Sequence, residues 1–259
     1  MTIVLLPPSE SKLSPDSGPK LDLENLAFPE LVNRRAKAID ALTKLSSGRQ
    51  AKALTALGIS KKQEVELIRN QNLLVAPTAP AWQIYSGVLF EALDAGSLTA
   101  VQLKKLCKQT YVQSALFGLL SFGDQIPAYR LSGDSVLPKI GSLPKFWAPT
   151  CTKLLAQESE LIIDLRSGTY VKLGPLPFES NSVVPKILQR MKSGPPKVVS
   201  HHNKATKGRI LRAIAQSKSK VKSIDDLAKI ITELGADVEI KAPAKVAGPV
   251  VLEVVVDVL

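Results

Sequence analysis

Acidic residues are missing from a long segment in the second half of the chain. Between Asn181 and Ile224 there is no Asp or Glu. This segment, called here the acid-free stretch, carries eleven basic residues: Lys186, Arg190, Lys192, Lys197, Lys204, Lys207, Arg209, Arg212, Lys218, Lys220 and Lys222. The formal net charge of the whole chain is also +11, so the remainder is electrically balanced. Such a local excess suits nucleic acid or an acidic membrane surface, but solvated surfaces show it too, and charge alone leaves both interpretations open.

Cysteine and histidine are scarce. The chain has two cysteines, Cys107 and Cys151, and two histidines, His201 and His202. Two cysteines make no disulfide framework, and neither lies in a metal-ligand spacing. The apolar residues at 198–199 suggest a short strand, on which adjacent histidines would point to opposite faces and would not bind one metal ion together. We therefore expect no disulfide, no metal site and no cofactor.

Recognisable catalytic motifs are also missing. The sequence has no G-x-S-x-G elbow, no phosphate-binding P-loop, no G-x-G-x-x-G turn and no H-E-x-x-H helix. Motifs therefore leave open whether the protein is an enzyme.

Long apolar runs are missing as well. None approaches the roughly 20 residues that span a bilayer, and the N-terminal run lacks the positive region of a signal peptide. We expect a cytoplasmic protein without a membrane partner.

What the sequence does contain is material for a packed core, because 45% of its 259 residues are hydrophobic. Hydrophobic patterning predicts strands at residues 2–6, 111–120, 128–131, 161–165, 237–240 and 250–258. It predicts helices at residues 29–45, 50–57, 60–70, 82–93, 97–108, 144–157 and 223–234. The alternation favours an α/β or α+β fold, a single compact domain of mixed sheet flanked by helices over residues 1–259. We assign its core to residues 1–240, a linker to 241–249 and a C-terminal strand to 250–259.

Two loops that follow predicted strands carry polar residues suited to a site. Ser9, Glu10 and Lys12 follow the first strand, and Ser167 and Tyr170 follow the strand at 161–165. Loops at the ends of α/β strands commonly carry sites, and a small-residue turn after a strand can hold an anion. The same residues also occur in ordinary surface turns.

Arg130 lies among apolar neighbours. A buried arginine needs partners, so we expect it to be half of an ion pair or an anion ligand.

The centre of the acid-free stretch predicts a short strand, a turn and then a basic helix. Lys204, Lys207 and Arg212 can share a broad face of that helix. The N-terminal end of the helix at Asn203 adds its own attraction for anions. We expect Lys204, Lys207 and Arg212 to form the core of a polyanion site, and the later lysines, Lys218, Lys220 and Lys222, to be a solvated run.

Several separated segments together resemble the YaaA peroxide-stress family, formerly an uncharacterised group named UPF0246. The resemblance rests on residues 7–12, 85–87, 115–118, 129–131, 146–147 and 164–170, and on Lys172, residues 199–200, Lys204, Lys207, Gly208 and Arg212. It extends from Met1 to about Ile240. The chain departs from the family pattern at Ala115, where members often have glycine, and in the tail at 250–259.

This resemblance implies a cytosolic protein that protects cells from hydrogen peroxide by limiting free iron and oxidative DNA damage. It also implies DNA binding without base specificity, through a positively charged cleft and a helix–hairpin–helix element. That element would fall on residues 115–124, where Gly118 would let backbone N–H groups approach a phosphate.

We therefore expect a DNA-binding stress protein whose DNA or anion site includes Lys12, Gly118, Arg130, Lys172, Lys204, Lys207, Arg209 and Arg212. The alternative is an enzyme acting on a nucleotide or nucleobase in a polar pocket built from Ser9, Glu10, Tyr85, Ser167 and Tyr170. An iron-binding protein is disfavoured because the sequence supplies few ligands for iron. The oligomeric state is left open.

Overall fold

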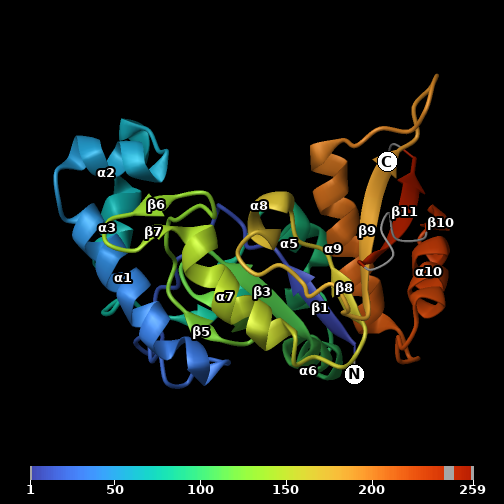
Figure 1. Ribbon diagram of the computed structural model, residues 1–259, viewed down its shortest axis with the longest axis horizontal. Helices are drawn as coiled ribbons and strands as arrows, with labels where there is room; N and C mark the ends of the chain where they lie inside the picture. Colours follow the sequence, from blue (N-terminus) through green and yellow to red (C-terminus); the bar gives the residue numbers. More distant parts are fainter. Residues whose placement is uncertain (1, 242–247, 258–259) are drawn as a thin grey trace.

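A seven-stranded mixed sheet runs from the middle of the molecule to one of its ends (Figure 1). The computed structural model describes residues 2–241 and 248–257. In spatial order the strands are β10 (Asp237–Lys241), β11 (Val250–Val256), β9 (Ser182–Gln189), β8 (Ile162–Asp164), β1 (Ile3–Leu6), β3 (Thr110–Ser114) and β4 (Gly118–Ser121). The strands from β11 to β3 run parallel, and the two outer pairs, β10–β11 and β3–β4, are antiparallel. The α/β prediction is confirmed.

The central strands are apolar because both of their faces are covered. All four residues of β1 are buried, as are all three of β8. Parallel strands of this kind have near-continuous apolar sequences, since helices pack on both sides of the sheet. The predicted strands at 2–6 and 161–165 are therefore confirmed.

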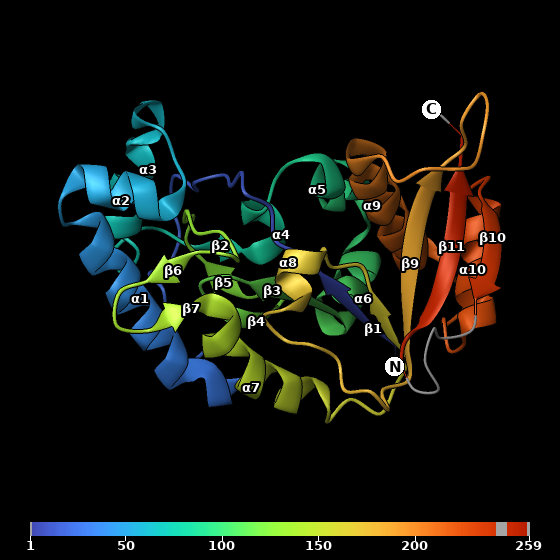
Figure 2. The same ribbon diagram turned by 45° about the horizontal axis from the view of Figure 1, so that its top comes forward.

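The described residues form ten α-helices, besides three 3₁₀ helices of three residues each. The α-helices are α1 (Val32–Ser46), α2 (Gln50–Leu57), α3 (Val65–Gln71), α4 (Ala81–Ile84), α5 (Val88–Leu93), α6 (Ala100–Gln109), α7 (Leu143–Leu155), α8 (Gly168–Val171), α9 (Ser200–Gln216) and α10 (Ile224–Glu233). Short strands pair as β2 (Ala79–Pro80) with β5 (Gln125–Ile126), and as β6 (Val136–Leu137) with β7 (Gly141–Ser142). Figure 2 shows α1 to α3 at one end of the molecule, and α9 and α10 with β9 to β11 at the other.

None of the described helices has the length and hydropathy that a bilayer crossing requires.

The helix predicted at residues 82–93 is interrupted. It divides into α4 and α5, and Gly87 between them has a φ of 94°. At the break Lys12 forms a β-bridge with Tyr85, and the Ser86 N–H donates to the Ser11 carbonyl. Backbone groups released from the helix thus bind the loop that follows β1. The sequence pattern missed this break because the apolar spacing continues through it.

Three local predictions are wrong. Residues 128–131 form no strand, because β4 is the strand that returns along β3. Residues 168–171, expected as a turn, form the short helix α8. Both histidines lie in the first turn of α9 rather than on a strand, so the argument from opposite strand faces does not apply.

The segment expected to supply a helix–hairpin–helix element is instead a β-hairpin. Residues 115–117 form the turn between β3 and β4, and their amides at Leu116 and Phe117 donate to the Ser114 hydroxyl. Gly118 has a φ of 73°, and a Cβ on it would lie 2.9 Å from the Trp147 ring. The glycine therefore serves a tight turn and close packing on tryptophan. Phosphate-binding amides are not presented here, because the hairpin is buried.

The C-terminal strand is an interior strand of the sheet. β11 lies between β10 and β9, and its Leu252 and Val254 are fully buried. β11 therefore belongs to the same sheet as the strands of residues 2–241. Most of the predicted linker, residues 242–247, lies outside the described residues.

Candidate functional site

The polar residues predicted after the first strand lie at the carboxyl ends of three neighbouring parallel strands. β1 runs into the loop at residues 7–12, β3 ends at Ser114, and β8 ends at Asp164. Sites of α/β proteins form at this edge because the loops that leave the strands converge there.

Lys12 is the most unusual residue of this cluster. Its side chain is enclosed, with 8% of the residue exposed, and Nζ donates to the Ser9 carbonyl at 2.6 Å and the Glu10 carbonyl at 3.3 Å. Nζ also lies 4.2 Å from the centroid of the Tyr129 ring and 5.5 Å from that of Tyr85. Burial, followed by the positive charge of Arg130, lowers the pKa of Lys12 to about 7. The neutral amine is therefore far more accessible here than at an ordinary exposed lysine.

Three hydroxyl groups form a buried chain beneath Lys12. The hydroxyl oxygens of Tyr85 and Tyr129 are 3.0 Å apart, and that of Tyr129 is 2.8 Å from Ser114 Oγ. Burial raises the pKa of Tyr129 well above its usual value and also raises the pKa of Tyr85. Both phenols are therefore neutral, and their rings lie next to the Lys12 amino group.

Arg130 forms an ion pair with Glu10, at 3.1 Å between Nη2 and Oε2. The Arg130 side chain is 15% exposed and the Glu10 side chain is 64% exposed, so Glu10 is the solvated member of the pair. Arg130 Nε is buried without a hydrogen-bond partner among the described residues. The backbone of Arg130 is fixed by Asn70, whose side chain bonds both its N–H and its carbonyl. Of the two roles expected for Arg130, the ion pair is present, and Nε keeps donor capacity for an anion.

α8 closes the cluster from the β8 side. Burial, and then the charge of Glu10, raises the pKa of Tyr170 to about 12, while a backbone hydrogen bond with Gly133 acts in the opposite direction. The charges of Glu10 and Arg130 both act on the Tyr170 phenol, so α8 lies within electrostatic range of the loop after β1. Ser167 precedes α8 as its N-terminal flanking residue.

A buried ion pair supports this edge of the sheet. Arg166 donates to both carboxylate oxygens of Asp164, at 2.9 and 2.7 Å, and also to Gln113 and the Gly174 carbonyl. Lys207 of α9 donates to the Arg166 carbonyl at 3.3 Å, which ties α9 to the segment before α8. Burial lowers the pKa of Lys207, while the Asp164 charge raises it.

The acid-free stretch divides into engaged and exposed cations. Lys186 pairs with Glu253, and Arg190 pairs with Asp237 and Asp257. Arg212 donates to the carbonyls of Leu93 and Asp94 and to the Ser97 hydroxyl, and thereby joins α9 to the end of α5. Lys207 is engaged as described above. The remaining side chains have no hydrogen bond or ion pair to another described residue: Lys192, Lys197, Lys204, Arg209, Lys218, Lys220 and Lys222.

The structure thus brings one part of the predicted site together and leaves the other part separate. Hydrogen bonds, an ion pair and ring contacts join Ser9, Glu10, Lys12, Tyr85 and Arg130. Tyr170 lies within range of the charges of Glu10 and Arg130, and Ser167 flanks its helix α8. Lys204 and Arg209 are exposed on α9, and Lys172 is exposed after α8. Gly118 is instead the first residue of β4, directly after the hairpin turn.

Sequence reasoning missed two members of the cluster, Tyr129 and Ser114. Tyr129 directly precedes Arg130 in one of the segments that carry the family resemblance, which was the available signal. Ser114 had none. Among the described residues, no group of three or more histidine, cysteine or acidic side chains is arranged to hold a metal ion.

Comparison with known proteins places the chain in a family. A family model described as peroxide stress protein YaaA matches residues 1–235. A UPF0246 protein of Corynebacterium efficiens is 43% identical over 247 residues, which is 94% of this chain and 97% of the relative. A UPF0246 protein of Streptomyces coelicolor is 35% identical over 256 residues, 98% of each chain. An uncharacterized protein of Campylobacter jejuni is 29% identical over 222 residues, covering 84% and 86%. The chain belongs to the peroxide stress protein YaaA family.

Proposed function

We propose that this peroxide-stress protein binds duplex DNA without base specificity and limits iron-dependent oxidative damage to it. The observation that carries the proposal is the set of exposed, unpaired cations in the acid-free stretch, above all Lys204 and Arg209 on α9. Cations that are already paired with carboxylates have little attraction left for phosphate, whereas unpaired ones release counterions from DNA on binding.

Within this proposal the basic residues of α9 have two roles. Lys204 and Arg209 contact phosphates. Lys207 and Arg212 hold the helix against the segment before α8 and the end of α5, because their donors are directed at carbonyl groups there. Lys172, exposed after α8, adds positive charge on the side of the Lys12 cluster.

The salt dependence of binding tests this proposal. In a titration of a short fluorescent duplex, log K should fall with log salt with a slope of about −2 or steeper, since each neutralised phosphate contributes about −0.9. Duplexes of scrambled sequence should bind equally well, because no set of base-reading side chains is evident. A slope near zero would exclude the electrostatic account.

Protection of DNA provides a second test. Nicking of a plasmid by Fe²⁺ and hydrogen peroxide should decrease when the protein is added at low salt. The protection should disappear at a salt concentration that releases the DNA. Protection that persists without binding would point to another mechanism, such as removal of the peroxide.

The second candidate function is an enzyme acting on a nucleotide or nucleobase at the Lys12 cluster. The observation that favours it is the convergence of Lys12, Glu10, Arg130 and Tyr170 at the carboxyl edge of the sheet. A lysine with a pKa of about 7 can act as a base or nucleophile at neutral pH, and Arg130 can hold a phosphate.

Product analysis separates this candidate from simple binding. The protein would be incubated with a panel of nucleobases, nucleosides and nucleotides, and the mixtures analysed by chromatography. The enzyme hypothesis predicts conversion of at least one compound by the wild type and loss of that conversion in Lys12→Met. The absence of conversion across the panel would reject it.

A further inference from the structure

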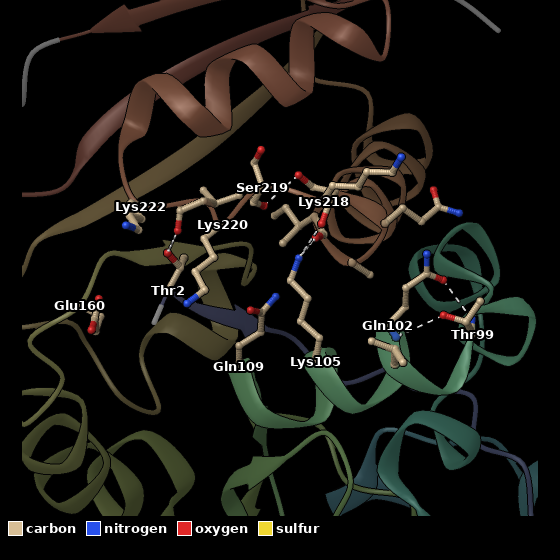
Figure 3. A pocket seen from close by; sticks show the side chains of 16 residues that line it. Thr2, Thr99, Gln102, Lys105, Gln109, Glu160, Lys218, Ser219, Lys220 and Lys222 are labelled. Carbon is tan, nitrogen blue, oxygen red and sulfur yellow. Dashed lines mark hydrogen bonds between the residues drawn. The ribbon is translucent and has the colours of Figure 1, made fainter.

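A cavity of about 730 Å³ lies at the opposite end of β1 from the Lys12 cluster (Figure 3). It is bordered by Thr2, which precedes β1, by α6, and by the end of α9 with the segment that follows it. The Thr2 hydroxyl donates to the Val221 carbonyl and so fixes one side of the opening. Its volume is within the range of small-molecule sites.

Much of the lining is apolar. Val101 of α6, Ile214 and Ala215 of α9, and Val221 contribute aliphatic surface from three separate segments. Val101 is 80% exposed and Ile214 is buried, so the apolar lining extends from the mouth of the cavity to its interior. Such a wall favours a ligand with an apolar body.

A buried polar group lies in the same lining without a partner. Gln109, the last residue of α6, is 4% exposed, and its Nε2 has no hydrogen-bond partner among the described residues. Figure 3 shows the side chain rising from α6 toward the space between Lys105 and Lys220. A buried donor without a hydrogen bond destabilises the folded protein by about 1–3 kcal/mol. A ligand that supplies a hydrogen-bond acceptor here would remove this destabilisation.

Positively charged side chains line the same cavity. Lys105, Lys218, Lys220 and Lys222 line the cavity, against one carboxylate, Glu160. Lys105 Nζ donates to the carbonyls of Ile214 at 2.7 Å and Ser217 at 3.1 Å, which leaves one of its three protons for another acceptor. The Lys220 ammonium points into the same space as the Gln109 amide (Figure 3).

We propose that this cavity binds a small amphiphilic anion, with an apolar body and one carboxylate or phosphate head group. The head group accepts hydrogen bonds from Gln109 Nε2, Lys105 and Lys220. The body lies against Val101 and Ile214. The site is separate from the Lys12 cluster and from the exposed cations at the start of α9, so it does not depend on either function proposed above.

Isothermal titration with a matched set of eight-carbon probes tests the proposal. Octanoate and octyl phosphate supply the two head groups, octanol has the body without the charge, and inorganic phosphate has the charge without the body. At least one amphiphilic anion should bind about tenfold more tightly than octanol and inorganic phosphate, a difference of about 1.4 kcal/mol. The anion that binds more tightly shows whether the site prefers a carboxylate or a phosphate head group. Equal binding of octanol, or no binding of either anion, would overturn the proposal.

Variants locate the binding in this cavity. Lys220→Gln and Gln109→Leu should each weaken binding of the preferred anion several-fold. Lys192→Gln removes the same charge from an exposed lysine outside the cavity and should leave binding unchanged. Gln109 is buried, so the melting temperature of its variant must be compared with the wild type, whereas Lys220→Gln tests the site even if Gln109→Leu fails to fold. Equal losses in Lys220→Gln and Lys192→Gln would show diffuse charge attraction and reject the site.

Discussion

Nζ of Lys12 lies 4.2 Å from the centroid of the Tyr129 ring, in a setting where burial and Arg130 lower the pKa of the lysine to about 7. The aromatic ring offers some stabilisation to a cation, but it does not replace the water that burial removes. The structure therefore places a lysine with a lowered pKa beside the guanidinium group of Arg130.

This relationship predicts an unusual titration of Lys12. In a protein labelled with ¹³C at lysine Cε, one signal should titrate with a midpoint near pH 7. The signal should be missing in Lys12→Met. The interpretation would be contradicted if every lysine signal titrated above pH 9.

The same shift predicts a pH dependence of stability. The folded protein releases the Lys12 proton above about pH 7, whereas the unfolded chain keeps it until about pH 10.5. Between these values the unfolded state binds more protons, so the free energy of unfolding should rise with pH, by at most about 1.4 kcal/mol per unit. Below pH 7 the full penalty of burying the charge remains. Denaturant unfolding of wild type and Lys12→Met measures the difference, with Lys37→Met as the exposed control.

DNA affinity should depend on the position of the lost charge. Replacing Lys204 and Arg209 with Gln should weaken duplex binding about tenfold, about 1.4 kcal/mol. Replacing Lys218 and Lys222, which follow the other end of α9, should have a much smaller effect, although it removes the same charge. Both double variants change side chains without hydrogen bonds to described residues, so neither should alter the fold. Equal losses would mean that binding is spread over the whole basic surface.

Gly208→Ala should destabilise the protein, even though alanine is the better helix former by about 1 kcal/mol. A Cβ at position 208 would lie 2.2 Å from the Leu89 carbonyl oxygen and 2.9 Å from Ala92 Cβ, so α9 would have to move away from α5. Overpacking of this kind costs about 1–3 kcal/mol, and a backbone contact cannot be relieved by a rotamer change. Thermal and denaturant unfolding measure the change. Gly168→Ala is the control, since its Cβ would meet no atom within 4 Å and should be tolerated.

The cysteines should not carry the peroxide response. Both are free thiols; Cys151 is fully buried, and burial raises its pKa to about 11 and also raises the pKa of Cys107. Peroxide reacts with the thiolate, so both should react slowly. Thiol labelling of the native protein should leave Cys151 unmodified until the chain unfolds. A Cys107→Ser, Cys151→Ala variant should keep peroxide protection in cells; a folded variant that lost it would refute this prediction.

Many of the strands and helices could be predicted from the local pattern of apolar and capping residues. The buried run at β1 and the capped helices, such as α10 with Ser223 at its N-terminus, were predicted because a strand or helix signals its type through its own residues. The break at Gly87 and the hairpin at residues 115–117 were not predicted, because contacts with distant segments determine their conformations. The loop after β1 contacts the break, and Trp147 packs against the hairpin.

The candidate site shows the same division. The sequence by itself determined which residues carry chemistry, because the loop of Ser9, Glu10 and Lys12 and the acid-free stretch are local patterns of charge. Only the tertiary structure decided which charges are available. Lys207 and Arg212 meet carbonyl groups 41 and 119 residues away, and Arg130 meets Glu10 across 120 residues. Partners so distant in sequence leave no periodicity, since burial and pairing are properties of the packed chain.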